Sequence, residues 1–211
     1  MQAEKIIGLF YAKEPELCRL LLKHSLQVRG KALQIAGSAG LLLDLETVSA
    51  GALLHDIGII RCHAPGILCF GGLPYIAHGV AGAEMLRAYG SEHGLDCEVF
   101  ARICERHTGS GLTAEDIRSQ HLPLPVRDFI PETDEEILIC LADKFFSKSG
   151  EMKEKGFASA RRSMAKFGDS SLARFDAMCR RMNVSASLPP ISEISGETVA
   201  ALSAALCSPH G

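Results

Sequence analysis

The chain has 211 residues, of which 47% are hydrophobic and 22% are charged; this balance is typical of one globular domain and excludes disordered and collagen-like proteins. Its formal net charge is -3 at pH 7, so no general positive field favours a nucleic-acid polymer as its partner. The N-terminus carries no export signal and the uncharged apolar runs are too short to cross a membrane, so we expect a soluble cytoplasmic protein with no membrane partner.

Eight cysteines are spread along the sequence, at positions 18, 62, 69, 97, 104, 140, 179 and 207. No two of them form a C-x-x-C pair, which argues against a zinc ribbon. Most lie inside apolar runs, where a free thiol behaves as a small hydrophobic group. We therefore expect reduced cysteines rather than disulfides.

Apolar residues recur at helical intervals along most of the chain, and no alternating strand pattern stands out, so we expect an all-α fold. Pro15 is placed like a first-turn proline, and a long helix is predicted from Glu16 to about Ala39, ended by Gly37 or Gly40. Asp44 is expected to cap a second, buried helix from Thr47 to His55.

The segment 58–77 is rich in glycine and proline and predicts a long connection with its own turns, of the kind that is often functional. A third helix is predicted from about His78 to Tyr89, ending at Gly90, and a fourth from about Asp96 to His107. Thr133 is expected to cap a later helix that carries Asp143. Beyond Gly150 the sequence becomes basic and helical, without a catalytic pattern, which is typical of solvated helix faces.

Six histidines and aspartates fall on five separate predicted helices: His24, His55, Asp56, His78, His107 and Asp143. Helices packed side by side can aim imidazole nitrogens and carboxylate oxygens at one point, as a divalent transition metal requires. His55 and Asp56 interrupt an apolar run, where leaving them unpaired would be costly, and a metal would satisfy them. Taken singly, each histidine is also explained as a hydrogen-bonded core or capping group, and Asp143 as a partner of Lys144 or Arg106.

Taken together, these residues resemble the HD-domain metal-dependent phosphohydrolase superfamily and, more distantly, the symmetrical diadenosine tetraphosphate hydrolases. The resemblance spans about residues 24–149 and follows the order H…HD…H…H…D. It rests on these segments: His24–Leu26 (HSL), Gly51–Gly58 (GALLHDIG), His78–Glu84 (HGVAGAE), Glu105–Gly109 (ERHTG) and Leu141–Lys144 (LADK). It implies an HD-domain helical bundle over residues 1–150 with a C-terminal helical extension, residues 151–211, packed on the same domain.

The resemblance also implies a function, namely hydrolysis of a phosphate ester or anhydride of a nucleotide or another small phosphorylated metabolite by a metal-activated water. Two divalent ions are implied, with Fe, Mn, Zn, Co and Ni not distinguished. The first ion would be held by His24, His55, Asp56 and Asp143. Asp56 would bridge to the second ion, held by His78 and His107, whose nitrogens should then lie within about 6 Å of the Asp56 oxygens.

The sequence departs from many relatives in having Ile59 where a lysine often follows the HD motif. Arg61 and His63 are candidates to bring the missing positive charge to a phosphate, although Arg61 is equally explained as a solvated loop residue. His78 and His107 are alternatively substrate contacts or helix-terminal histidines beside a one-metal site. Two other functions stay open, a di-iron HD-fold oxygenase and a noncatalytic metal-bearing regulatory module.

Overall fold

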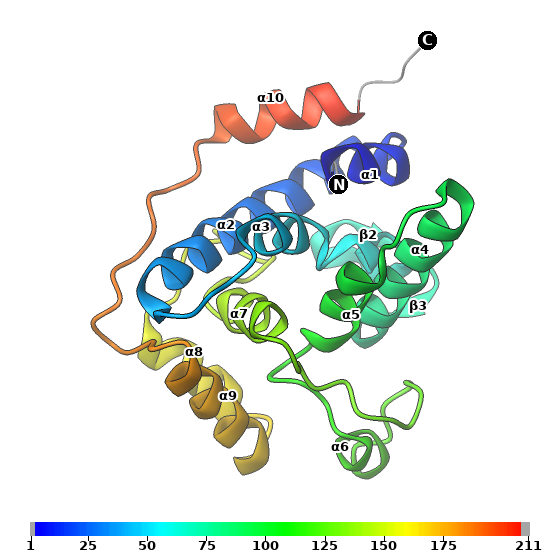
Figure 1. Ribbon diagram of the computed structural model, residues 1–211. Coiled ribbons are helices and arrows are strands. Elements are labelled where there is room, and N and C mark those ends of the chain that lie inside the picture. Colours follow the sequence, from blue (N-terminus) through cyan, green and yellow to red (C-terminus); the bar gives the residue numbers. More distant parts are fainter. Residues whose placement is uncertain (1–2, 208–211) are drawn as a thin grey trace.

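The computed structural model describes residues 3–207, and helices make up most of it (Figure 1). The all-α prediction is confirmed. The α-helices are α1 (Ala3–Tyr11), α2 (Pro15–Ala39), α3 (Leu45–Leu54), α4 (His78–His93), α5 (Glu98–Arg106), α6 (Ala114–Ser119), α7 (Asp134–Asp143), α8 (Phe157–Ala165), α9 (Asp169–Arg181) and α10 (Gly196–Cys207).

Helix α2 is the long helix that the sequence predicts. Pro15 stands at its start and Gly40 ends it in the left-handed conformation, at φ 67°. The buried face of α2 packs on α3 and α7, and α10 also packs on α2. Figure 1 shows α10 above α2 and α7 below it. Helix α2 therefore connects the central helices to the C-terminal part of the chain.

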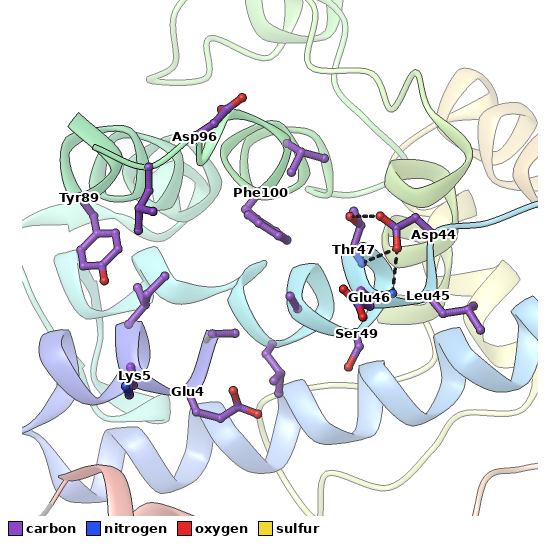
Figure 2. Close-up of a pocket in the computed structure, with 16 residues that line it drawn as sticks. Glu4, Lys5, Asp44, Leu45, Glu46, Thr47, Ser49, Tyr89, Asp96 and Phe100 are labelled. Atoms are coloured by element: carbon purple, nitrogen blue, oxygen red, sulfur yellow. Dashed lines mark hydrogen bonds between the residues drawn. The ribbon is translucent and has the colours of Figure 1, made fainter. Parts of the chain in front are cut away.

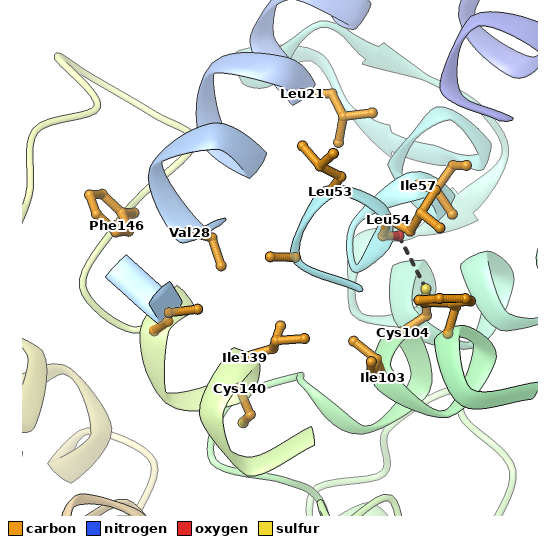
Figure 3. Close-up of a cluster of buried hydrophobic side chains, with 14 of the residues drawn as sticks. Leu21, Val28, Leu53, Leu54, Ile57, Ile103, Cys104, Ile139, Cys140 and Phe146 are labelled. Atoms are coloured by element: carbon orange, nitrogen blue, oxygen red, sulfur yellow. Dashed lines mark hydrogen bonds between the residues drawn. The ribbon is translucent and has the colours of Figure 1, made fainter. Parts of the chain in front are cut away.

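The core lies where α2, α3, α5 and α7 meet (Figure 3). Leu53, Ile103 and Ile139 are essentially buried within it. Gly51 lets α3 approach its neighbours closely, because a Cβ there would come within 2.6 Å of Ile103 Cδ1 and 2.8 Å of Ile139 Cδ1. Asp44 caps α3 by accepting hydrogen bonds from the backbone of Glu46 and Thr47, as predicted.

The connection between α3 and α4 is built from very short elements. They are the 3₁₀ turns η1 (Ile57–Arg61), η2 (Pro65–Ile67) and η3 (Tyr75–Ala77), and the strands β1 (Cys62–Ala64), β2 (Cys69–Phe70) and β3 (Leu73–Pro74). β1 lies between the other two strands, antiparallel to β2 and parallel to β3. Strands of two or three residues are too short to show an alternating pattern, so the sequence did not predict this sheet.

Helix α4 extends beyond its predicted end. It passes through Gly90 and ends at Gly94, which has φ 65°. At Gly90 the helix lies so close to the next loop that a Cβ would come within 2.6 Å of the Leu95 carbonyl. The glycine that suggested a helix end is therefore explained by close packing, and the predicted end was wrong.

The segment after Gly150 contributes α8, α9 and α10. Helix α9 lies against α7, and α10 lies against α1 and α2. The ammonium of the buried Lys31 on α2 is 2.6 Å from a carboxylate oxygen of Glu154 and donates to the carbonyl of Pro189 at 3.0 Å. The first two residues of the predicted domain and the last four of the predicted extension lie outside the described residues.

Two further expectations concern the whole chain. Cys18 is disulfide-bonded, so the expectation of reduced cysteines was wrong at that position, whereas six other cysteines among the described residues are free thiols. Across residues 3–207, no helix has the length and apolar character needed to cross a membrane.

Candidate metal centre

The six predicted metal ligands converge in the middle of the bundle. His24 lies within α2, His55 ends α3 and is followed by Asp56, His78 begins α4, His107 follows α5, and Asp143 ends α7. Their side chains are buried or nearly buried. They form two groups that share Asp56, and the candidate ligand atoms within each group lie within 4.8 Å of one another. The geometry that the sequence predicted is therefore present.

The first group surrounds one oxygen of Asp56. Oδ2 of that carboxylate lies 3.1 Å from His24 Nε2 and 3.0 Å from His55 Nε2. His24 Nε2 is also 3.0 Å from Oδ1 of Asp143. Two imidazole nitrogens and two carboxylates thus face one point, the ligand set of a transition-metal site.

The second group surrounds the other oxygen of the same carboxylate. Asp56 Oδ1 lies 3.4 Å from His78 Nε2 and 3.3 Å from His107 Nε2, well inside the distance expected from the sequence. The two Nε2 atoms are 3.0 Å apart. Asp56 therefore offers one oxygen to each group, as a carboxylate that bridges two ions does.

Backbone contacts fix the orientation of three of the four imidazole rings. The Nδ1 atoms of His55, His78 and His107 lie 2.8, 2.7 and 2.7 Å from the carbonyl oxygens of the residues three positions earlier. A carbonyl can only accept, so Nδ1 of each ring carries a proton and Nε2, which points at the centre, is the ring atom available to bind a metal.

The centre brings possible metal ligands face to face. The Nε2 atoms of the imidazole rings face each other and the Asp56 oxygens, and neither of these oxygens has a hydrogen-bond partner of acceptable geometry. Buried acceptors without donors are costly, and a cation among them removes that cost. The donor set and the unsatisfied oxygens both fit divalent metal ions.

The pKa values of the centre show that its carboxylate attracts positive charge. Burial lowers the pKa of His55, but the adjacent Asp56 carboxylate outweighs it and raises that pKa to about 9. Burial and the neighbouring His107 lower the pKa of His78 to about 3. Burial would raise the pKa of Asp56, but His55 and Lys148 hold it well below its usual range. Asp56 is thus ionised, and His78 is neutral with a free lone pair.

Glycines bring the elements of the centre together. A Cβ at Gly58 would collide with the backbone of His78 and Gly82, so η1 and α4 touch directly. A Cβ at Gly79 would come within 2.5 Å of the Cys104 carbonyl, which brings α4 against α5. These two contacts place Asp56, His78 and His107 side by side.

The structure gives Arg61 and His63 no place in either group. Arg61 is half exposed, and its guanidinium lies 3.7 Å from a carboxylate oxygen of the exposed Glu84. His63 is exposed on β1. Arg61 ends η1 and His63 lies on β1, and their nearness to the HD motif in sequence does not bring them into contact with Asp56.

Two lysines to which the sequence analysis gave no part in the site lie beside it instead. Lys144 Nζ is 2.7 Å from Asp143 Oδ2 and donates to the His107 carbonyl at 2.9 Å. Lys148 Nζ is 2.6 Å from Asp56 Oδ2. Lys144 had been considered only as a partner of Asp143, and a search for basic residues within two helical turns of Asp143 would have found both.

A cavity of about 970 Å³ lies elsewhere, between α1, α3, α4 and α5 (Figure 2). Figure 2 shows Phe100 pointing into it and Asp44 at its rim, where Asp44 is engaged in capping α3. None of the residues of the two histidine groups lines this groove. This cavity is therefore separate from the candidate metal centre, despite its volume.

Comparison with known proteins identifies the family of this chain. The family model of the HD domain matches residues 21–147, a range that contains all six converging residues, and the chain belongs to this family. Membership indicates a metal-dependent hydrolase, and the paired His/Asp groups are compatible with divalent metal binding.

Curated relatives share this part of the chain. A tRNA (cytidine(56)-2'-O)-methyltransferase of Picrophilus torridus is 38% identical over 128 residues, covering 61% of this chain and 32% of the relative. An uncharacterised protein of Methanocaldococcus jannaschii is 38% identical over 126 residues, covering 58% of this chain and 64% of the relative. A methyltransferase of the same name from Thermoplasma volcanium is 35% identical over 133 residues, covering 63% and 33%.

The matched region is thus about a third of the two methyltransferases and less than two thirds of the Methanocaldococcus protein. No solved structure matches the chain.

Proposed function

We propose that this protein is a binuclear metal-dependent phosphohydrolase that cleaves a phosphate ester or anhydride of a nucleotide or another small phosphorylated metabolite. The observation that supports it is the division of the Asp56 carboxylate between two imidazole groups, with three of the four rings held by backbone carbonyls so that Nε2 faces inward. A carboxylate that bridges two ions and is flanked by inward-facing imidazoles is a hydrolytic arrangement.

The residues have separate roles in this proposal. His24, His55, Asp56 and Asp143 would hold one divalent ion, and Asp56, His78 and His107 the other. When bound, the two ions supply an activated water for attack on phosphorus and neutralise charge on the phosphoryl oxygens. The chain itself fixes the ligands: backbone carbonyls orient the rings, and Lys144 holds Asp143 in place through their 2.7 Å ion pair.

A small substrate fits the depth of the centre. Asp56 is fully buried and the four histidines are at most 5% exposed, so the phosphoryl group must enter the bundle to reach them. The methyltransferase relatives are named for tRNA. We propose hydrolysis rather than methyl transfer for this chain because the chemistry around Asp56 is that of a metal centre, and an RNA substrate is included as an arm of the test.

The test is a hydrolysis screen with defined metals. Protein freed of metal and reloaded separately with Mn²⁺, Co²⁺, Fe²⁺, Zn²⁺, Ni²⁺ or Mg²⁺ is assayed anaerobically for phosphate release from nucleotides, dinucleoside polyphosphates, sugar phosphates and RNA ends. His55→Ala is the inactive control, and Arg61→Ala should remain active. Phosphate release that needs both metal and His55 supports the proposal.

Two outcomes contradict it. Oxygen consumption by the reduced-iron protein, without phosphate release in any anaerobic arm, identifies an oxygenase. Full metal occupancy with neither reaction identifies a noncatalytic metal-bearing module. Either result replaces the proposed hydrolase.

A further inference from the structure

Among the lysines and arginines of residues 3–207, Lys148 is the one in contact with the shared carboxylate. It lies five positions after Asp143, in the segment that follows α7, and its side chain is only 12% exposed. Its ammonium is 2.6 Å from Asp56 Oδ2, the oxygen that His24 and His55 also face. A lysine this deeply buried needs an anionic partner, because an unpaired buried charge is strongly unfavourable.

The ammonium lies beside the first histidine group rather than at its centre. A cation at the centre would contact Asp143 as well as Asp56, yet within the described chain Lys148 pairs with Asp56 and forms no ion pair with Asp143, whose ammonium partner is Lys144. Lys148 therefore lies next to the place where the inward-facing nitrogens and carboxylate oxygens would hold an ion.

Tyr75 completes the surroundings of the lysine. Its ring stacks on His78, with the ring centroids 4.8 Å apart and an interplanar angle of 19°, and its hydroxyl interacts with Lys148. Its backbone carbonyl is the acceptor that orients His78. One residue thus connects the lysine beside the first group to a histidine of the second.

The balance of charge changes when ions share Asp56. Both oxygens of the carboxylate would then be engaged, and Lys148 would be a buried donor in need of another anion. Lys144 does not lack an acceptor in the same way, because Asp143 Oδ2 and the His107 carbonyl already accept from it. The candidate partner for Lys148 is the phosphoryl group of the substrate.

On the basis of the proposed function, we infer that Lys148 binds a nonbridging oxygen of a dianionic terminal phosphoryl group, so that the substrate is a phosphomonoester or a terminal phosphate of an anhydride rather than a phosphodiester. A terminal phosphoryl group has three nonbridging oxygens, one for each of the two ions and one for Lys148. A phosphodiester has two nonbridging oxygens and a single negative charge, which leaves the ammonium without a partner.

A purely structural lysine would behave differently. If Lys148 only held Asp56 in position, its loss would impair metal binding and would affect monoesters and diesters alike. Binding of a terminal phosphate instead predicts a selective effect. The ratio of monoester to diester activity and the metal content therefore distinguish the two roles of Lys148.

The experiment compares Lys148→Gln and Lys148→Arg with Lys153→Gln, the matched control. Lys153 lies in the same segment, is 76% exposed and pairs only with the equally exposed Glu151 among the described side chains. Each metal-loaded protein is assayed with p-nitrophenyl phosphate and bis(p-nitrophenyl) phosphate, titrated with inorganic phosphate by calorimetry, and analysed for metal content.

We expect Lys148→Gln to keep its metal but to lose about 10- to 100-fold in kcat/KM for the monoester and in affinity for inorganic phosphate, the effect of one charge-assisted hydrogen bond. Its kcat/KM for the diester should change less than about 3-fold, a difference too small to represent such a bond. Lys148→Arg should recover part of both losses, and Lys153→Gln should match the unaltered protein.

Equal losses on both esters, unchanged phosphate affinity, or a preference of the unaltered protein for the diester would overturn the inference while leaving the hydrolase intact. Phosphate binding that depends on Lys148 in a protein that hydrolyses neither ester would support the anion site and contradict the proposed function instead. If Lys148→Gln does not fold, Lys148→Arg decides: retained metal with a lowered but measurable phosphate affinity supports the inference, and a phosphate affinity equal to that of the unaltered protein contradicts it.

Discussion

Asp56 and Glu136 are both buried carboxylates, but their partners are of different kinds. Glu136 accepts from Arg102 Nε at 2.7 Å, from Arg106 Nη1 at 3.3 Å and from the backbone N–H of Glu132 at 2.7 Å. Asp56 faces four imidazole nitrogens at 3.0 to 3.4 Å, of which three belong to rings that have already committed their Nδ1 proton to a carbonyl. One carboxylate is satisfied by arginine and backbone donors, and the other is surrounded by imidazole nitrogens with the Lys148 ammonium beside them.

The difference teaches how a structural ion pair is distinguished from a candidate metal site. Burial is the same in both places, so burial alone does not decide. Arginine is always charged and can only donate, whereas an imidazole held through Nδ1 presents a lone pair. A buried carboxylate among arginines is complete, and a buried carboxylate among oriented imidazoles is a candidate metal ligand.

The largest expected effect comes from removing the shared carboxylate. Asp56→Asn should lose metal from both groups and lower kcat/KM by more than the roughly 100-fold that loss of an outer-shell metal partner costs. Elemental analysis and the phosphate-release assay measure both effects. Glu136→Gln, the matched change at the other carboxylate, should retain its metal; equal metal loss in the two variants would erase the contrast.

Removal of metal should destabilise the folded chain. Without a bound cation, the inward-facing acceptors of His78 and His107 oppose each other. Free metal ions at a concentration of about 1,000 times their dissociation constant stabilise the native state by roughly 4 kcal/mol. For a chain of this size, that corresponds to a fall in melting temperature of roughly 8 to 16 °C on chelation. The same chelator should leave the melting temperature of Asp56→Asn nearly unchanged, and an unchanged wild-type curve would count against a buried, occupied centre.

Replacement of Glu136 should lower the free energy of unfolding without changing the metal content. Glu136→Gln leaves Arg102 and Arg106 without their shared buried partner, and since both arginines keep some access to water we expect a loss of about 2 to 3 kcal/mol in the free energy of unfolding. Urea denaturation of the metal-loaded protein measures this loss. A change below about 0.5 kcal/mol, the range of ordinary surface substitutions, would show that the arginine network is not structural.

The smallest effect concerns acid stability away from the metal centre. Burial would raise the pKa of Glu105, but ion pairs with Arg87 and Arg127 lower it below the ordinary value. A carboxyl group whose folded pKa is below its unfolded pKa contributes stability above the unfolded pKa, and this contribution is lost as the pH falls through the folded pKa. Because both arginines are partly exposed, the contribution should be about 1 kcal/mol. It should disappear below about pH 4.5, the ordinary value.

Comparison of urea unfolding at pH 7 and in this acid range tests the expectation. The fall in stability should be smaller in Glu105→Gln than in the unaltered protein, because the variant lacks the titrating group. An identical dependence on pH in the two proteins would show that the pairs with Arg87 and Arg127 contribute nothing.

The sequence predicted those parts of the molecule whose signals are local. Asp44 and Thr133 cap α3 and α7 as expected, and Pro15 and Gly40 bound α2. The six converging residues were found because each adjoins an apolar helical run and because their order resembles the HD family. Local periodicity and caps were sufficient for these elements.

The remaining features depend on contacts between distant segments. The strands of the 58–77 connection have two or three residues each and depend on pairing with one another. Helix α4 passes Gly90 because of its packing against the following loop. Lys148 reaches Asp56 only because of the path of the chain after α7, whereas Arg61, nearer in sequence, pairs with Glu84. Sequence distance alone could not reveal these contacts.

Metal stoichiometry tests the central claim most directly. Elemental analysis of protein reconstituted with a single metal and freed of excess should give two ions per chain for the unaltered protein and about one for His78→Ala, which keeps the group of His24, His55, Asp56 and Asp143 intact. One ion per chain in both proteins would contradict a centre in which Asp56 is shared between two ions.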